Sequence, residues 1–423
     1  MSLLFLFLFI VVLLTSKFLW GRIFTPFTVF LGSFTLCFCL FYGSSFLYKD
    51  LSSHSIIIVL FSIFSFICGS LIYKVIPKKN IGKSSKVKKN FYNEINIEVF
   101  SNIVFVLSVI GFMGYMISIQ RSIGILNAIQ NPNLLNIAIS QDLIQVNSLI
   151  LILFKLSLPN SGLILIQNLI FRKKKKNIIF WIISVAINIS VRRNVLFYLI
   201  IFNLFIYLYF IQSKKLRKID LKKFIPIILS LGTLISFFQY MQKSLNKETM
   251  ILKPEIFSIP VSSNIINALL YYIGNPQSFS QYLEENNGIV NNVFFLGASL
   301  RFPYKMLSIP LDLNFDDTFL EMNFVNIPYL FNTTFSQYYV YIEGGIIWVI
   351  ILYFFIGFVS SRFFVKYTKS NNFITLMWLS FITLCLFFSV REYLPILLDF
   401  WVFVVYMLTL MFITNFKKEK KIK

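Results

Sequence analysis

Residues 2–20 read SLLFLFLFIVVLLTSKFLW, and this apolar stretch sets the class of protein before any other part of the chain. Its only charge is Lys17, close to its end. About 20 helical residues cross the roughly 30 Å apolar layer of a bilayer, so the stretch predicts a membrane-spanning helix. No basic segment precedes it and no small-residue cleavage signature follows it, which favours a retained span over a cleaved signal peptide.

Similar runs recur along the whole chain. Of the 423 residues, 57% are hydrophobic and only 13% are charged, and the mean hydropathy is +0.76. Globular domains hold about half apolar and about a quarter charged residues. We therefore expect an all-α, polytopic membrane protein of about 11 transmembrane helices. The predicted spans are 2–20, 27–48, 56–73, 99–119, 148–171, 178–190, 195–211, 224–241, 338–359, 373–390 and 394–414.

The distribution of positive charge predicts the orientation of these spans. The net charge is +22, and 28 of the 39 Lys and Arg residues lie in every second connection or in the C-terminal tail. Such residues are retained on the cytoplasmic side, so we expect a periplasmic N-terminus and a cytoplasmic C-terminus. The long connection 242–337, with 8 acidic and 5 basic residues, then forms one large periplasmic loop.

This loop divides the chain into three predicted parts. A membrane bundle of about 8 spans occupies 1–241, and a second bundle of about 3 spans with a basic tail occupies 338–423. Between them, the loop 242–337 is expected to contain an amphipathic helix around residues 264–283. Loops of this length are usually functional, so we look for part of the site there.

Several function classes are disfavoured by the residues present. Basic blocks between apolar runs are typical of membrane topology and not of nucleic-acid binding. The four cysteines lie inside apolar runs and His54 is the only histidine, so no disulfide framework, zinc site or Ser/His/Asp triad is expected. Gly82-Lys83-Ser84 resembles the end of a phosphate-binding loop, but Pro77 stands where its first Gly belongs. We expect no metal and no cofactor.

Arginines near the membrane are the first candidates for function, because a charge there usually has a task or a partner. Arg192 and Arg193 follow the short run 178–190, whose 13 residues extend only about 20 Å. The pair should therefore lie below the membrane surface at the start of the next helix, where a phosphate or pyrophosphate is well bound. Snorkelling to lipid headgroups or pairing with acidic residues of the loop is the alternative interpretation.

Other cations occupy the same predicted side. Arg391 and Arg121 lie at predicted outer helix ends, which suggests a shared site for an anionic lipid. Neutralisation of Arg391 by the adjacent Glu392 is the alternative. Within the loop, Arg301 and Lys305 form a second cationic patch.

One lysine lies inside a predicted span. Lys155 precedes Leu158-Pro159, where we expect the helix of 148–171 to break. A broken helix at membrane depth must face protein or water, so Lys155 is a candidate functional residue. Its alternative role is as the ion-pair partner of Asp399 or Glu343.

Carboxylates of the loop, and residues where the loop enters the next predicted span, complete the candidates. Asp316 and Asp317 are either a general base or solvated loop charges. The segment 332–345 reads NTTFSQYYVYIEGG and leads from the loop into the span 338–359. Tyr338 and Tyr339 form either a sugar-binding platform or an interfacial aromatic belt, and Glu343 is either a base or the partner of an outer arginine.

These features together resemble the O-antigen or oligosaccharide repeat-unit polymerases of the Wzy type. The resemblance lies in eleven spans, a large outer loop in the second half, SVRRN at 190–194 after a short span, and the segment 332–345 running into acid-Gly-Gly. It covers nearly the whole chain, although the motifs are short. The family commonly has Ser-Arg-Gly before the seventh span, whereas Arg193-Asn194 stands here, and Glu343 stands where many members have Asp.

The resemblance implies a lipid-carrier glycosyltransferase of the bacterial inner membrane that needs neither metal nor nucleotide. It would transfer a growing glycan from undecaprenyl pyrophosphate onto a second lipid-linked repeat unit, in lipopolysaccharide or related surface polysaccharide biosynthesis. Membrane lipids and lipid-linked oligosaccharides are its expected partners, with a chain-length regulator as a further candidate. Asp317 and Glu343 are the candidate catalytic bases. The candidate substrate-binding residues are Arg192, Arg193, Arg301, Arg391, Arg121, Tyr338 and Tyr339, with Tyr271 and Tyr272 as further glycan contacts.

Three other classes compete with this interpretation. An O-antigen ligase uses the same donor but usually carries a histidine in the large outer loop, which is absent here. A flippase for the lipid-linked unit is a transporter with short loops, which the 96-residue connection disfavours. A metal-dependent enzyme using lipid-phosphate sugars places its carboxylate in the first large outer loop, and that loop holds only Asp50.

Overall fold

The structure is a computed structural model that describes residues 1–44, 48–75, 94–130, 134–135, 138, 143–144, 146–170, 175–189, 193–213, 272–285, 299–306, 325–327, 330–331 and 333–415. Most of these residues are helical. The described strands are β1 (Val325–Asn326) and β2 (Leu330–Phe331), which pair antiparallel with Val325 opposite Phe331.

The helices belong to two compact units. The first unit comprises Met1–Ser84, Leu252–Asn371 and Phe381–Leu397. The second comprises Ser85–Ile251, Asn372–Ser380 and Leu398–Lys423, and α17 (Phe373–Phe388) has residues in both. The first holds α1 (Ser2–Trp20), α2 (Pro26–Gly43), α3 (Ser53–Val75), α13 (Asn275–Glu285), α14 (Arg301–Met306), α16 (Ser336–Ser370) and the 3-10 turn η4 (Leu394–Ile396). The second holds α4 (Glu94–Ser122), α5 (Ile125–Gln130), α7 (Ser148–Lys155), α8 (Ser157–Ile170), α9 (Lys175–Ile189), α10 (Arg193–Ser213) and α18 (Leu398–Asn415).

Seven helices of the described part are long and apolar enough to cross a membrane, as an all-α membrane protein requires. They are α1, α2, α3, α4, the continuous pair α7 and α8, α10 and α16. The apolar helices α17 and α18 are shorter. The predicted short span 178–190 corresponds to α9, which has 15 residues. The predicted span 224–241 lies outside the described residues.

Several predicted boundaries are wrong, and the span expected over 27–48 corresponds to a helix that ends at Gly43. The break expected at Pro159 does not form: α7 and α8 are separated only by Leu156, whose backbone stays helical at φ −60° and ψ −20°. A proline in the first turn of a helix lacks only an N–H that would be unpaired anyway. The span expected to end at Val359 continues to Ser370. The helix that corresponds to the last predicted span begins at Leu398, since Pro395 lies in the 3-10 turn before it.

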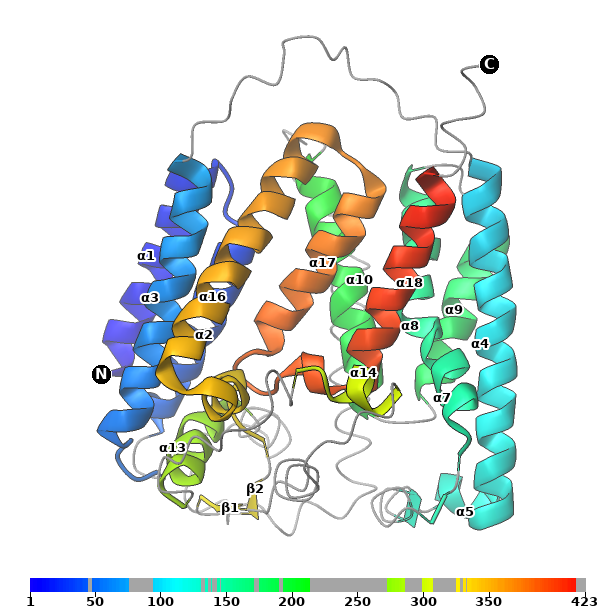
Figure 1. Ribbon diagram of the computed structural model, residues 1–423, viewed down its shortest axis with the longest axis horizontal. Helices are drawn as coiled ribbons and strands as arrows, with labels where there is room; N and C mark the ends of the chain where they lie inside the picture. Colours follow the sequence, from blue (N-terminus) through cyan, green and yellow to red (C-terminus); the bar gives the residue numbers. More distant parts are fainter. Residues whose placement is uncertain are drawn as a thin grey trace, which may run out of the picture. The chain divides into compact units, whose positions relative to one another are not determined.

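Small residues let α3 and α16 of the first unit pack with their backbones in contact. A Cβ atom built on Gly69 would lie 2.0 Å from the Phe354 carbonyl oxygen, and one on Gly357 would lie 2.3 Å from that of Phe66. The Ser70 hydroxyl donates to the Gly357 carbonyl at 3.2 Å. Such close approach is how membrane helices associate without a hydrophobic driving force. Figure 1 shows α3 and α16 side by side.

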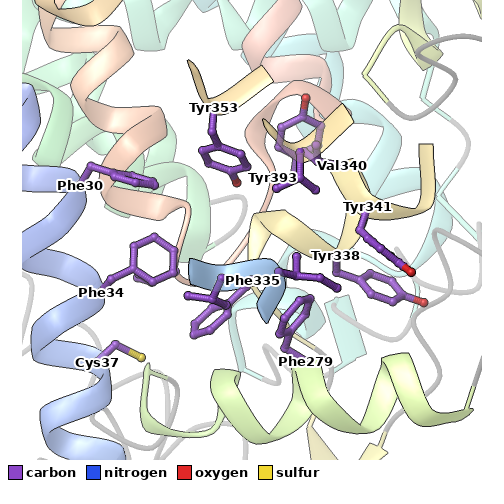
Figure 2. Packing of buried hydrophobic residues seen from close by; sticks show 14 of the residues in the cluster. Phe30, Phe34, Cys37, Phe279, Phe335, Tyr338, Val340, Tyr341, Tyr353 and Tyr393 are labelled. Carbon is purple, nitrogen blue, oxygen red and sulfur yellow. The ribbon is translucent and has the colours of Figure 1, made fainter. Parts of the chain in front are cut away.

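An aromatic core connects these helices to the segment before α16. Phe335, the N-cap residue of α16, is fully buried, and its ring lies 5.2 Å from that of Phe34 and 5.6 Å from that of Phe279. Phe30 contacts Phe66 with ring centroids 4.2 Å apart. Figure 2 shows Phe335 between Phe34 of α2 and Phe279 of α13. The core therefore holds α13 of the predicted loop against the apolar helices.

Polar contacts join the helices of the second unit. Lys155 forms an ion pair with Asp399, with side chains only 17% and 13% exposed, which confirms one of the two partners expected for this lysine. The Asn160 side-chain oxygen accepts bonds from the Ser101 hydroxyl at 3.2 Å and from the Tyr406 hydroxyl at 3.1 Å. Hydrogen bonds of this kind are common between membrane helices.

Candidate functional site

The predicted site residues are distributed over both units. Arg192 and Asp317 lie outside the described residues, as do Asp316 and Tyr271. Arg193 is the first residue of α10, in the second unit, and its side chain is not described. Arg121, also in the second unit, is exposed in the last turn of α4. The first unit holds six further candidates, namely Tyr272, Arg301, Tyr338, Tyr339, Glu343 and Arg391.

Glu343 lies at a break within α16 that the following glycines create. Gly345 has φ +68°, a left-handed conformation that glycine adopts without strain. A Cβ on Gly344 would lie 2.8 Å from the Cβ of Trp348. Glycine at 344 thus lets Trp348 approach, and its indole N–H donates to Glu343 Oε2 at 3.1 Å. The acid-Gly-Gly sequence therefore builds a buried carboxylate, 8% exposed, at a helix break.

Ser299 supplies the other hydrogen bonds of this carboxylate. Its backbone N–H donates to Glu343 Oε1 at 2.6 Å, and its hydroxyl lies 2.9 Å from Oε1 and 3.1 Å from Oε2. The Tyr393 hydroxyl lies 2.7 Å from the Ser299 hydroxyl. We call Glu343, Ser299, Trp348 and Tyr393 the Glu343 cluster. It joins the segment before α14, the break of α16 and the turn after α17.

The turn after α17 buries an arginine. The backbone N–H groups of Arg391 and Glu392 both donate to the Phe388 carbonyl at 2.8 Å, so the chain curls over the C-terminal end of α17, where a cation is favoured. The Ser389 carbonyl accepts from the Ser336 N–H at 2.8 Å, which fixes this turn to the start of α16. Arg391 is only 6% exposed.

Buried polar atoms of the first unit lack a hydrogen-bond partner among the described residues. The Tyr272 ring centroid lies 6.4 Å from that of Phe387, four residues before Arg391. Burial raises the pKa of the Tyr272 hydroxyl, while Arg391 acts to lower it and Glu392 to raise it. Buried polar groups are normally paired with protein, water or ligand. This arrangement therefore suits a polar, anionic ligand beside Arg391. The unpartnered atoms include the Tyr272 hydroxyl, Gln277 Oε1, Thr334 Oγ1 and Glu392 Oε1.

The predicted glycan-binding residues Tyr338 and Tyr339 differ in their surroundings. Tyr338 is buried, with its ring centroid 5.3 Å from that of Tyr282 in α13. Tyr339 is half-buried and stacks on Tyr393 at 6.2 Å and 17°. Tyr338 thus serves the core, whereas Tyr339 lies against the Glu343 cluster.

Arg301 begins α14, two residues after Ser299. It is half-buried, and its guanidinium carbon lies 5.8 Å from the centroid of the Phe302 ring. The chain therefore carries one predicted cation beside each of two members of the Glu343 cluster, since Arg391 lies two residues before Tyr393.

Ser299, Trp348 and Tyr393 are site residues that the sequence did not indicate. Ser299 and Glu343 are 44 residues apart, and Ser299 and Tyr393 are 94 apart. A lone serine or tyrosine carries no spacing signal. For Trp348 the sequence does contain an indication, because this residue lies within two helical turns of the acid-Gly-Gly segment.

The fold and this site define a class, a polytopic all-α membrane protein with a buried carboxylate and a buried arginine at helix ends. Comparisons of the chain with protein-family models, with curated proteins and with solved structures gave no match. Among the described residues, no three His, Cys, Asp or Glu side chains are grouped to hold a metal ion.

Proposed function

We propose that this protein polymerises undecaprenyl-pyrophosphate-linked oligosaccharide repeat units into O-antigen or a related surface polysaccharide at the outer face of the bacterial inner membrane. The proposal includes eleven spans, a periplasmic N-terminus and loop, and a cytoplasmic C-terminus. It rests on the charge asymmetry of the connections and on the resemblance of the segments 190–194 and 332–345 to polymerases of the Wzy type.

The observation that carries the proposal is the burial of Arg391 beside Tyr272 and Glu392. A buried cation next to unpartnered polar atoms supports binding of a ligand that combines negative charge with hydroxyl groups. A sugar joined to pyrophosphate has both properties. Arginine suits it because the planar guanidinium binds phosphate oxygens in a bidentate manner.

The proposed reaction breaks the bond between the anomeric carbon of the donor glycan and its pyrophosphate oxygen. An acceptor hydroxyl of the second repeat unit attacks that carbon and transfers its proton to a carboxylate, for which Asp317 and Glu343 are the candidates. Negative charge develops on the leaving pyrophosphate, where fixed guanidinium groups stabilise it without a metal. Arg391 and Arg301 are the described candidates for this role.

The direct test is deletion of the gene in its source bacterium, followed by separation of surface glycolipids on a gel. We expect the ladder of repeat lengths to be replaced by single-repeat caps. Loss of every repeat with long lipid-linked chains accumulating would identify a ligase. Single units retained on the cytoplasmic face would identify a flippase, and an unchanged ladder would refute the whole pathway assignment.

The arginine is tested by complementation of the deletion strain. Arg391→Ala should reduce polymer by about 100-fold or more, the range for loss of one charge-stabilising donor, and Arg391→Lys by less. Arg362→Ala removes an exposed arginine of the same unit and should restore the full ladder. Equal activity of Arg391→Ala and Arg362→Ala at equal membrane levels would refute the role of Arg391.

A further inference from the structure

The Glu343 cluster joins three segments that are distant in sequence. Ser299 precedes α14, Glu343 and Trp348 flank the break of α16, and Tyr393 ends the turn after α17. All three segments belong to the first unit. The carboxylate is thus the common attachment point of two segments that each carry a predicted substrate-binding arginine.

The hydrogen positions in this cluster follow from counting protons. The Ser299 hydroxyl has one proton, and it lies within hydrogen-bond distance of both carboxylate oxygens. A carboxylate only accepts, so this proton points to Glu343. The Ser299 oxygen is then the acceptor toward Tyr393, whose hydroxyl donates to it at 2.7 Å. The order of donation is Tyr393 to Ser299 to Glu343.

This arrangement leaves Glu343 little capacity to act as a base. An ionised carboxylate has about four acceptor positions. Three donors, the Ser299 N–H, the Ser299 hydroxyl and the Trp348 indole N–H, already occupy both oxygens, and the residue is 8% exposed. A general base instead needs a lone pair within about 3 Å of the substrate proton that it removes.

We infer that Glu343 is a positioning residue, which with Ser299 and Tyr393 holds Arg301 and Arg391 in place for a pyrophosphate-bearing substrate. Each arginine is two residues from a member of the cluster, so movement of Ser299 or Tyr393 is transmitted along a short length of backbone. This inference rests on the proposed function, and it leaves Asp317 as the candidate base.

The test compares the activities of two Glu343 variants, for which a positioning role and a role as catalytic base predict different results. Glu343→Gln removes the base but keeps a carbonyl oxygen that accepts from the Ser299 N–H. Glu343→Ala removes both. If Glu343 is a positioning residue, we expect Glu343→Gln to reduce the amount of polymer by less than about tenfold. Glu343→Ala should reduce it by about 100-fold or more, which is comparable with the loss of a charge-stabilising donor.

The roles of Ser299 and Tyr393 are tested in the same deletion strain. Ser299→Ala and Tyr393→Phe should each weaken the ladder, because each removes one link of the chain of donors. Ser33→Ala is the matched control for serine, since the Ser33 hydroxyl donates only to its own helix at 2.9 Å from the Phe30 carbonyl. Glu285→Ala is the control for a carboxylate, since Glu285 is exposed at the end of α13. Both controls should complement fully.

A second readout does not depend on activity. Hydrogen exchange of the peptide 299–306 in the detergent-solubilised full chain should accelerate in Glu343→Ala, which lacks the acceptor for the Ser299 N–H, and remain close to wild type in Glu343→Gln. A Glu343→Gln variant as inactive as Glu343→Ala but with unchanged exchange would overturn the inference in favour of a catalytic base. Full activity of Glu343→Ala would overturn it as well.

The two readouts also separate the inference from the proposed function. If the wild-type gene proves to make no polymer, the proposed function fails, and the exchange of the peptide 299–306 still reports whether Glu343 holds that segment. If exchange is the same in Glu343→Ala and wild type, the cluster itself is refuted, whatever the activity.

Discussion

Replacement of Gly69 by alanine should destabilise the first unit more than its single added methyl group suggests. The new Cβ would lie 2.0 Å from the Phe354 carbonyl oxygen, and 2.9 Å from the Phe354 carbonyl carbon. Close carbon-to-oxygen contacts between helices are about 3.3–3.6 Å, so α3 and α16 must separate by more than about 1 Å. Both obstructing atoms are backbone, so no change of rotamer relieves the overlap.

The expected magnitude is in the upper part of the range for overpacking, about 2–3 kcal/mol. About 2 kcal/mol corresponds to a roughly 30-fold change in the ratio of folded to unfolded protein. Gly357→Ala meets the Phe66 carbonyl oxygen at 2.3 Å and should behave in the same way. One separation of the two helices relieves both overlaps, so the double variant should lose less than the sum of the single losses.

The assay is an unfolding titration with a denaturing detergent in mixed micelles, followed by tryptophan fluorescence. Gly43→Ala in α2 is the matched control, because its Cβ would find its nearest neighbour at an ordinary 3.4 Å, the Ser2 hydroxyl. We expect this control to unfold like wild type or slightly later, since alanine favours a helix over glycine. A Gly69→Ala variant as stable as the control would refute backbone contact between α3 and α16.

Two further predictions use the same titration. Lys155→Met should destabilise the second unit by an amount near the lower end of about 3–5 kcal/mol, because it leaves Asp399 without its partner while both side chains keep some exposure. Adding Asp399→Leu should recover most of the lost stability. A double variant that is less stable than Lys155→Met would contradict the pairing. Tyr353→Phe removes the hydroxyl that lies 2.7 Å from that of Ser336 and should lower stability by about 1 kcal/mol. In the Ser336→Ala background the same substitution should have almost no effect, and an unchanged loss there would show that Tyr353 acts through another contact.

The sequence predicted those parts of the fold that depend on one segment at a time. The apolar runs at 2–20, 56–73 and 195–211 correspond closely to α1, α3 and α10, because whether a run crosses a bilayer depends on its own length and hydropathy. The boundary errors arose where local signals compete. Pro159 was expected to end a helix and instead lies in the first turn of α8, where the same residue is tolerated.

The candidate site was predictable only in part. A carboxylate before two glycines at a membrane entry was a visible signal, and so was the uncommon charge of Arg391 at a helix end. Their burial could not be predicted, because a charged residue at such a position is equally compatible with contact to water. The Lys155 and Asp399 pair was one of two expected pairings, and charge alone did not choose between Asp399 and Glu343.

By itself, the sequence determined the membrane class, most of the apolar helices and a short list of charged residues, because hydropathy and charge are properties of local segments. Tertiary structure alone decided that Ser299 and Tyr393 meet at Glu343, and that Gly69 and Gly357 bring α3 against α16. These contacts join residues dozens to hundreds of positions apart. They depend on side-chain geometry within a packed core, and no period or spacing along the chain encodes it.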